Sequence, residues 1–278
     1  MRLSYGQQRL WFLDQLEGGS TEYNMTEALR LKGEVNEEAL ERAINTIVER
    51  HESLRTHFEV VEDEAVQVIE GQRIIELEKV DLRGMKGEEQ AEALGAAMAR
   101  ELEERFDLSC GPLLRVKLVK LGEEEQVLLR TMHHIVSDGW SEGVFNRELE
   151  ELYGAYVEGR ENRLEELLVQ YGDYAVWQRR WAEEEGGLEE GLRYWKEELA
   201  GIPERLELAG NRARGGKQSF AAGVRRKSLT RELTAGLKRV GRESGATLYM
   251  VMLAGFAVLL SRYSGQEDIV VGTPVANR

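Results

Sequence analysis

Cysteine and histidine are both scarce in this chain of 278 residues. The one cysteine, Cys110, has no partner for a disulfide within the chain, which favours a reducing compartment. The four histidines, His51, His57, His133 and His134, form no zinc-ligand spacing with it. No glycine-rich phosphate-binding loop is present either. The sequence therefore predicts that the protein holds no metal and no bound cofactor.

Long apolar runs and an excess of positive charge are also missing. The longest apolar run, 248–260, is too short to span a bilayer and predicts a buried helix instead. The first residues show no basic segment followed by an apolar one, so nothing signals export. With 37 basic against 51 acidic residues, the net charge of −14 would repel a phosphate backbone. We therefore expect a cytoplasmic protein that binds neither nucleic acid nor membrane.

Hydrophobic periodicity predicts a mixture of helices and strands. Ser4 and Gln7 have the spacing of a capping box before a short helix, and Asn36 can cap a second helix. The aromatic-rich helices from Tyr171 to Trp195 present a stripe that we interpret as core. The segment 201–216, rich in glycine and charge, is the predicted linker. Further helices are expected at 91–106, 144–156, 231–242 and 248–260, and strands at 26–31, 58–61, 65–69, 223–229 and 268–271.

The centre of the chain combines a predicted hairpin with a histidine motif. Residues 113–120 and 126–132 alternate as two strands around a turn at 122–125. The second strand runs directly into the sequence HHIVSDG at 133–139, and an amphipathic helix follows. The motif is therefore expected at a strand-to-helix junction, where side chains and backbone donors are exposed above a rigid sheet.

The motif suits acid–base chemistry, because histidine can take or give a proton near neutral pH. Acyl transfer to an amine or alcohol needs such a group beside the nucleophile, a task for which His134 is placed. Asp138 can fold the loop back and hold it, and Gly139 would keep the space above the histidine open. Ser137 and Ser141 lie close by, but neither sits in a glycine-flanked nucleophile elbow.

A purely structural interpretation of the same motif is also open. Adjacent histidines near a strand end can be hydrogen-bonded core residues, and Asp138 can be merely the N-cap of the next helix. Spacing alone does not decide between the catalytic and the structural interpretation.

Four other segments have the character of family motifs. They are SYGQQRLWFL at 4–13, RHESLRTHF at 50–58, YGDYAVW at 171–177 and VGTPVANR at 271–278. Together with HHIVSDG, and in this order, they resemble the motifs of condensation domains from nonribosomal peptide synthetases, with Gly6 where alanine is usual. The resemblance covers the whole chain. The opening segment, through Leu16-Glu17 to Tyr23-Asn24-Met25, is most similar to the subtype that joins an L-donor to an L-acceptor.

The resemblance implies an α/β (α+β two-layer) fold of two chloramphenicol-acetyltransferase-like lobes. Residues 1–165 would form the N-terminal lobe with the active-site motif, and 166–278 the connecting helices and an incomplete second lobe. The implied reaction is amide formation between a carrier-bound acyl or peptidyl thioester and a carrier-bound aminoacyl acceptor. Upstream and downstream peptidyl carrier proteins would present these substrates on phosphopantetheine arms, beside an adjacent adenylation domain.

The resemblance also implies roles for individual residues. His134 is expected to be catalytic, and His133 structural. An ion pair between Asp138 and Arg278 is expected to hold the histidine loop. The supporting residues of the active site would be His133, Asp138, Gly139, Trp140, Ser141 and Arg278.

Two alternatives to condensation stay open. An epimerisation domain shares the double histidine, although the run DGWS at 138–141 and the opening motif favour condensation. A non-catalytic fragment would keep only carrier docking. Because the second lobe is expected to be truncated, we expect the isolated chain to be inactive. The sequence at 208–212 lacks the prolines usual in the family, which predicts a more flexible linker.

Overall fold

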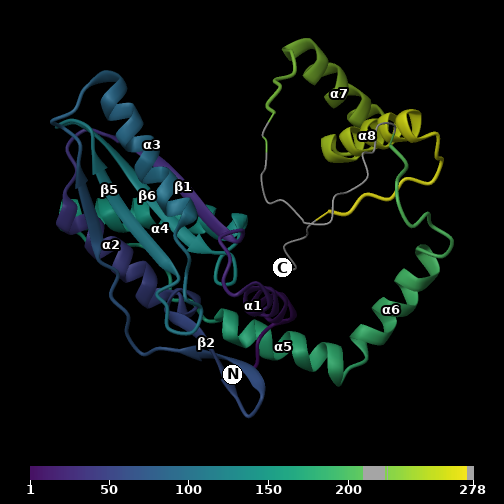
Figure 1. Ribbon diagram of the computed structural model, residues 1–278, viewed down its shortest axis with the longest axis horizontal. Coiled ribbons are helices and arrows are strands. Elements are labelled where there is room, and N and C mark those ends of the chain that lie inside the picture. Colours follow the sequence, from purple (N-terminus) through teal and green to yellow (C-terminus); the bar gives the residue numbers. More distant parts are fainter. Residues whose placement is uncertain (209–222, 224, 274–278) are drawn as a thin grey trace. The chain divides into compact units, whose positions relative to one another are not determined.

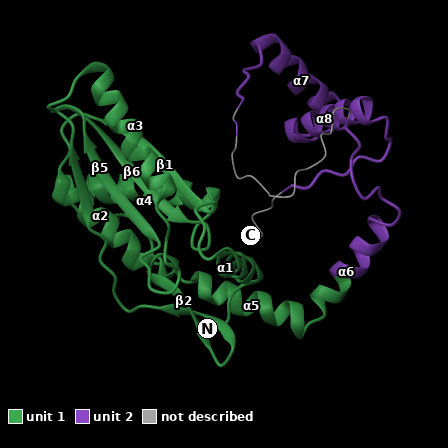
Figure 2. Ribbon diagram, viewed as in Figure 1, with its two compact units in different colours: residues 1–190 green, residues 191–278 purple. Residues whose placement is uncertain are grey.

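A computed structural model of the chain describes residues 1–208, 223 and 225–273 (Figure 1). The chain divides into two compact units, Met1–Glu190 and Gly191–Arg278 (Figure 2). The predicted lobe boundary after residue 165 stays a prediction. The boundary between the two compact units lies later in the chain, after Glu190. The predicted linker lies outside the described residues from 209 onward.

The first unit is built on a four-stranded sheet in the order β1-β6-β5-β4. The predicted hairpin of β5 (Leu114–Lys120) and β6 (Glu125–His133) is confirmed, and the expected strand β1 (Asn24–Lys32) pairs antiparallel with β6. The edge strand β4 (Leu77–Asp81) pairs parallel with β5 and was not expected from the sequence. Only Leu77 is buried in this short, charged strand, so the apolar pattern that would predict a strand from the sequence is weak.

Helices cover both faces of this sheet, as Figure 1 shows. Strand side chains alternate between the faces. Leu128 and Met132 pack with α2 (Glu37–Arg50) and α4 (Gly139–Glu158), whereas Val127 and Leu129 pack under α3 (Gly87–Glu103). Asn36 caps α2 as predicted, accepting a hydrogen bond from the Ala39 amide at 3.0 Å. The predicted helix to Phe106 is too long, because α3 ends at Glu103.

The end of the sheet where β6 stops is covered by α1 (Tyr5–Glu17) and a two-stranded hairpin, β2 (Thr56–Val61) and β3 (Glu64–Ile69). A short 3-10 helix, η1 (Glu52–Arg55), precedes the hairpin. The predicted capping box is confirmed, since the Ser4 hydroxyl accepts from the Gln7 amide at 3.1 Å and Gln7 accepts from the Ser4 amide at 3.0 Å. Trp11 packs in the same cluster as Phe58.

The aromatic stripe on α5 (Tyr171–Glu183) and α6 (Gly187–Glu198) is not core, which corrects the prediction. Trp177, Trp181 and Trp195 are 56%, 44% and 58% exposed. The helix α5 is attached through its other side, where the Arg179 guanidinium donates to the Leu3 carbonyl just before α1 at 2.8 Å and to the Gln8 side-chain oxygen of α1 at 2.5 Å. Because buried Arg179 and Ala175 occupy the inward side of α5, the aromatic rings lie on its outer side.

The second unit contains α7 (Arg231–Glu243) and α8 (Leu248–Ser264), close to the predicted ranges. The strands expected at 223–229 and 268–271 are wrong: the described residues of these segments form no strand, and Val224 lies outside the described residues. A strand needs a hydrogen-bonded neighbour, and no strand is described in this unit to serve as one. Among the described residues, no single helix is long and apolar enough to cross a membrane, whereas α7 and α8, bent by 105°, meet that criterion only as a pair.

The helix α8 is not buried, contrary to the expectation from its apolar sequence. Its exposed side chains include one stripe along the helix, formed by Tyr249, Met252, Phe256, Leu259 and Tyr263. An apolar stripe of this kind favours association in water. We expect the isolated chain to self-associate, and Phe256→Lys/Leu259→Lys to reduce that association in sedimentation velocity. A wild-type chain that stays monomeric at every concentration would contradict this expectation.

Candidate active site

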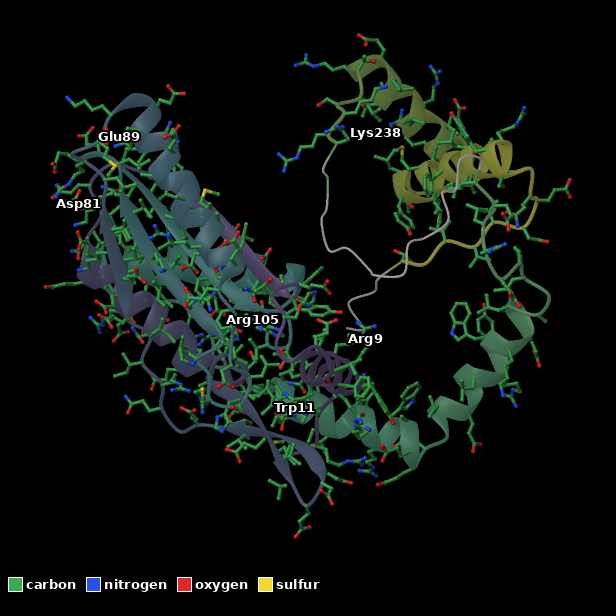
Figure 3. The ribbon with its side chains drawn as sticks, viewed as in Figure 1. Arg9, Trp11, Asp81, Glu89, Arg105 and Lys238 are labelled. Carbon is green, nitrogen blue, oxygen red and sulfur yellow. The ribbon has the colours of Figure 1, made fainter. Side chains whose placement is uncertain are left out.

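The histidine motif occupies the loop between β6 and α4, as predicted. The backbone of the loop is held on both sides: the His133 amide donates to the Leu113 carbonyl at 3.1 Å and the His134 amide to the Tyr23 carbonyl at 2.8 Å. The Val136 amide donates to the His133 carbonyl at 3.1 Å and closes a tight turn. Ile135 and Val136 are buried in the cluster that includes Trp11 of α1. Figure 3 labels Trp11 and Arg105 at this end of the sheet.

His133 is a buried and neutral histidine. Its side chain is 2% exposed and packs edge-on against Phe106 at 6.2 Å between ring centres. Its Nδ1 accepts a hydrogen bond from the Ile135 amide at 3.1 Å, which requires that nitrogen to be unprotonated. Burial, with a smaller contribution from neighbouring His134, lowers the pKa of His133 to about 4. The imidazole therefore supports the turn in its neutral form.

The low pKa of His133 predicts a loss of stability on acidification. The folded-state pKa lies below the ordinary value of about 6.5, so the unfolded chain binds more protons between pH 6.5 and 4. This contribution is complete above pH 6.5 and is lost as the pH falls toward 4. We expect the free energy of unfolding to fall by about 2 kcal/mol between pH 7 and pH 5 from this group.

Urea unfolding at the two pH values, compared with His133→Asn, isolates that contribution. Asparagine can still accept from the Ile135 amide but does not titrate, so the variant should lack the His133 part of the slope. Carboxylates with lowered pKa values, such as Glu148 and Glu101, lose their contributions mainly at lower pH. Equal slopes in the two proteins would contradict a buried neutral His133.

His134 differs from its neighbour in exposure. Its side chain is exposed, and its ring makes no hydrogen bond or ion pair with any described residue. Because the backbone on both sides is anchored, this imidazole is presented on a defined turn rather than on a mobile segment. The ring can therefore accept or donate a proton to a molecule that reaches the loop.

The residues after the turn begin α4. Asp138 is the N-cap: one carboxylate oxygen accepts from the Ser141 amide at 2.8 Å and from the Ser141 hydroxyl at 2.6 Å. A Cβ atom added at Gly139 would meet no described heavy atom within 4 Å, so protein packing leaves that space open. Trp140 is 67% exposed. Arg278 lies outside the described residues, so its pairing with Asp138 stays a prediction.

The structure shows buried polar groups whose burial the sequence analysis did not predict. The Ser137 hydroxyl and the Asn24 side-chain oxygen are buried without a hydrogen-bond partner among the described residues. Arg130, in the middle of β6, is 1% exposed and contacts Glu27 and Asn146. An arginine within the apolar run VLLRTM was a visible signal of a buried charge, because such a residue needs a partner. No group of three or more histidine, cysteine, aspartate or glutamate side chains suited to a metal ion occurs in the described part of the chain.

Comparison with known proteins identifies relatives over nearly the whole chain. One of the linear gramicidin synthase proteins from Brevibacillus parabrevis is 48% identical over 276 residues, which are 99% of this chain and 5% of that protein. Phosphinothricin tripeptide synthetase PhsC from Streptomyces viridochromogenes is 42% identical over 99% of this chain and 25% of that protein. The chain thus spans only a small part of these large synthetases.

Solved structures agree with this relationship. The first condensation domain of the calcium-dependent antibiotic synthetase, solved with a substrate analogue, is 26% identical with a TM-score of 0.78, over 99% of this chain and 65% of that one. The X-domain from teicoplanin biosynthesis is 33% identical with a TM-score of 0.80, over 94% of this chain and 57% of that one. These matches confirm the predicted chloramphenicol-acetyltransferase-like α/β fold. The model of the condensation domain family matches residues 1–278, and the chain therefore belongs to that family.

Proposed function

We propose that this chain catalyses amide formation between a donor acyl or peptidyl thioester and an aminoacyl acceptor, with His134 as the catalytic residue. One observation carries the proposal: an exposed imidazole, on a loop whose backbone is anchored, in a chain of the condensation domain family. The similarity of the opening segment to the L-donor, L-acceptor subtype supports L-configured substrates. Side-chain specificity is not part of the proposal.

The chemistry requires a neutral amine and a place for the proton that it loses. The acceptor nitrogen attacks the donor carbonyl carbon, and a tetrahedral oxyanion forms. His134 removes the proton from that nitrogen or orients the amine, the carbon–sulfur bond breaks, and the departing thiolate takes up the proton to become a thiol. The helix α4, 20 residues long, begins at the same loop, and the positive end of its dipole favours the developing negative charge.

The partners follow from this reaction. Both substrates would arrive as thioesters on phosphopantetheine arms, one from an upstream and one from a downstream peptidyl carrier protein. An adjacent adenylation domain would supply the activated acceptor. The printed names of the relatives, which are peptide synthetases, support this setting.

A binding role without catalysis is the second candidate. It is favoured by the similarity to the X-domain from teicoplanin biosynthesis, which has also been solved as a complex with OxyB. In that role the chain would dock carriers or enzymes without turnover. Epimerisation is a third outcome, because that class shares the double histidine.

A deuterium-incorporation experiment separates the three candidate functions, which are condensation, docking and epimerisation. Carrier-bound donor and acceptor are incubated in deuterium oxide with a synthetase that contains the domain, and the carrier-bound products are analysed by mass spectrometry. Condensation predicts a new amide on the acceptor carrier with no deuterium at either α-carbon. Deuterium at an α-carbon without transfer would indicate epimerisation, and carrier binding with neither change would indicate a docking role.

A further inference from the structure

A polar triangle of buried Arg130 with half-buried Glu27 and Asn146 joins α4 to the sheet. Glu27 on β1 and Arg130 on β6 are register partners, and their side chains form an ion pair. The Arg130 guanidinium also donates to the Asn146 side-chain oxygen on α4 at 2.8 Å. The Asn146 amide in turn donates to both Glu27 oxygens at 3.2 Å. Each member of the triangle therefore contacts the other two.

Arg130 is the member of the triangle that is costly to bury. The Arg130 side chain is 2% exposed, its Nε has no hydrogen-bond partner among the described residues, and desolvation lowers its pKa. Its guanidinium lies over the Phe145 ring at 4.2 Å from the centre. A buried ion pair of this kind adds little stability compared with apolar side chains of similar size. Stability is therefore a poor reason for its presence, whereas a unique arrangement of the elements is a better one.

The triangle lies where it can hold α4 in place beside the histidine loop. The bond between Arg130 and Asn146 closes a segment of the chain that begins three residues before the end of β6 and includes the whole histidine loop. Glu148 of α4 also bonds to Arg50 and His51 at the end of α2, whereas the other described contacts of α4 with the sheet are made by apolar side chains such as Phe145 and Leu149. Apolar contacts are not directional and tolerate small sliding or rotation, whereas hydrogen bonds require a defined distance and angle.

We propose that Arg130 is a positioning residue that, through Glu27 and Asn146, sets the rotation and height of α4 on the sheet and thereby the place of His134. The inference rests on the proposed function of His134. It assigns no contact between Arg130 and substrate. The effect on catalysis arises because a displacement of about 1 Å in a catalytic group can lower a rate by about 100-fold.

The test replaces the triangle by apolar side chains. The triple variant Glu27→Leu/Arg130→Met/Asn146→Leu removes all three polar groups together and leaves no unpaired charge. Arg130→Met alone is measured beside it. The matched control is Glu101→Gln/Lys117→Met, which disrupts another buried ion pair of the first unit, on α3 and β5 and away from α4. All variants are compared in hydrogen–deuterium exchange of the Ser141 and Glu142 amides, which both donate to Asp138, and in condensation kinetics within a synthetase that contains the domain.

We expect the Ser141 and Glu142 amides to exchange at least about tenfold faster in both Arg130 variants than in the wild type and the control. We expect kcat to fall about 10- to 100-fold with KM unchanged, although the triple variant stays folded. Wild-type exchange and wild-type kcat in the triple variant would overturn the inference. If the wild type itself forms no amide, the proposed function fails, and the exchange rates alone decide whether Arg130 positions α4.

Discussion

Replacing His134 with alanine is expected to lower the rate of amide formation by about 10²- to 10⁴-fold. The imidazole is the exposed acid–base group of the loop, and alanine can neither hold the amine proton nor orient the amine. The measurement is the rate of peptide transfer between loaded carriers in a synthetase that contains this domain with the substitution.

Two controls belong to this experiment. Carrier loading should be unchanged, because the loop takes no part in thioester formation. The free energy of unfolding should change by less than about 0.5 kcal/mol, because the His134 ring is exposed and contributes no hydrogen bond within the described residues. Transfer at a rate near that of the wild type would remove His134 from the catalytic role.

Replacing the neighbouring His133 with alanine is expected to act on stability instead. The variant loses the ring packed against Phe106 and Tyr23 and leaves the buried Ile135 amide without its acceptor. A cavity of this size and an unsatisfied amide together cost about 3–5 kcal/mol. Urea unfolding at pH 7 measures the difference.

The matched variant is His133→Asn, which keeps an acceptor for the Ile135 amide. It should be less destabilised than His133→Ala by about 1–2 kcal/mol. If the alanine variant is as stable as the wild type, the hydrogen bond and the ring packing do not support the turn. We thus expect different phenotypes from the two adjacent positions: His134→Ala lowers the rate of amide formation, and His133→Ala lowers the stability.

The elements that could be predicted from the sequence are those whose signals are local. The capping box of Ser4 and Gln7, the N-cap of Asn36 and the hairpin before the histidine motif each depend on residues a few positions apart. The placement of 133–139 at a strand-to-helix junction follows from the same hairpin. Asp138 is the N-cap of α4, the structural interpretation that spacing had left open.

The features that could not be predicted depend on partners distant in the sequence. Phe106 continues the apolar period of α3, yet it lies beyond the helix and is buried against His133. The aromatic stripe of α5 has the period of a core face, but the side that contacts α1 is the one with Arg179. The run VLLRTM could indicate a buried arginine, but not its partners, because Glu27 lies 103 positions from Arg130 and Asn146 lies on another element.

The central claim is that this chain joins two carrier-bound substrates, and one single-turnover measurement tests it most directly. A donor carrier bearing a labelled acyl or aminoacyl thioester is mixed with a loaded acceptor carrier and a synthetase that contains the domain. The predicted result is that the label appears on the acceptor carrier in a new amide, at a rate that His134→Ala lowers by about 10²- to 10⁴-fold. A label that stays on the donor carrier while both carriers remain loaded and bound would contradict the claim.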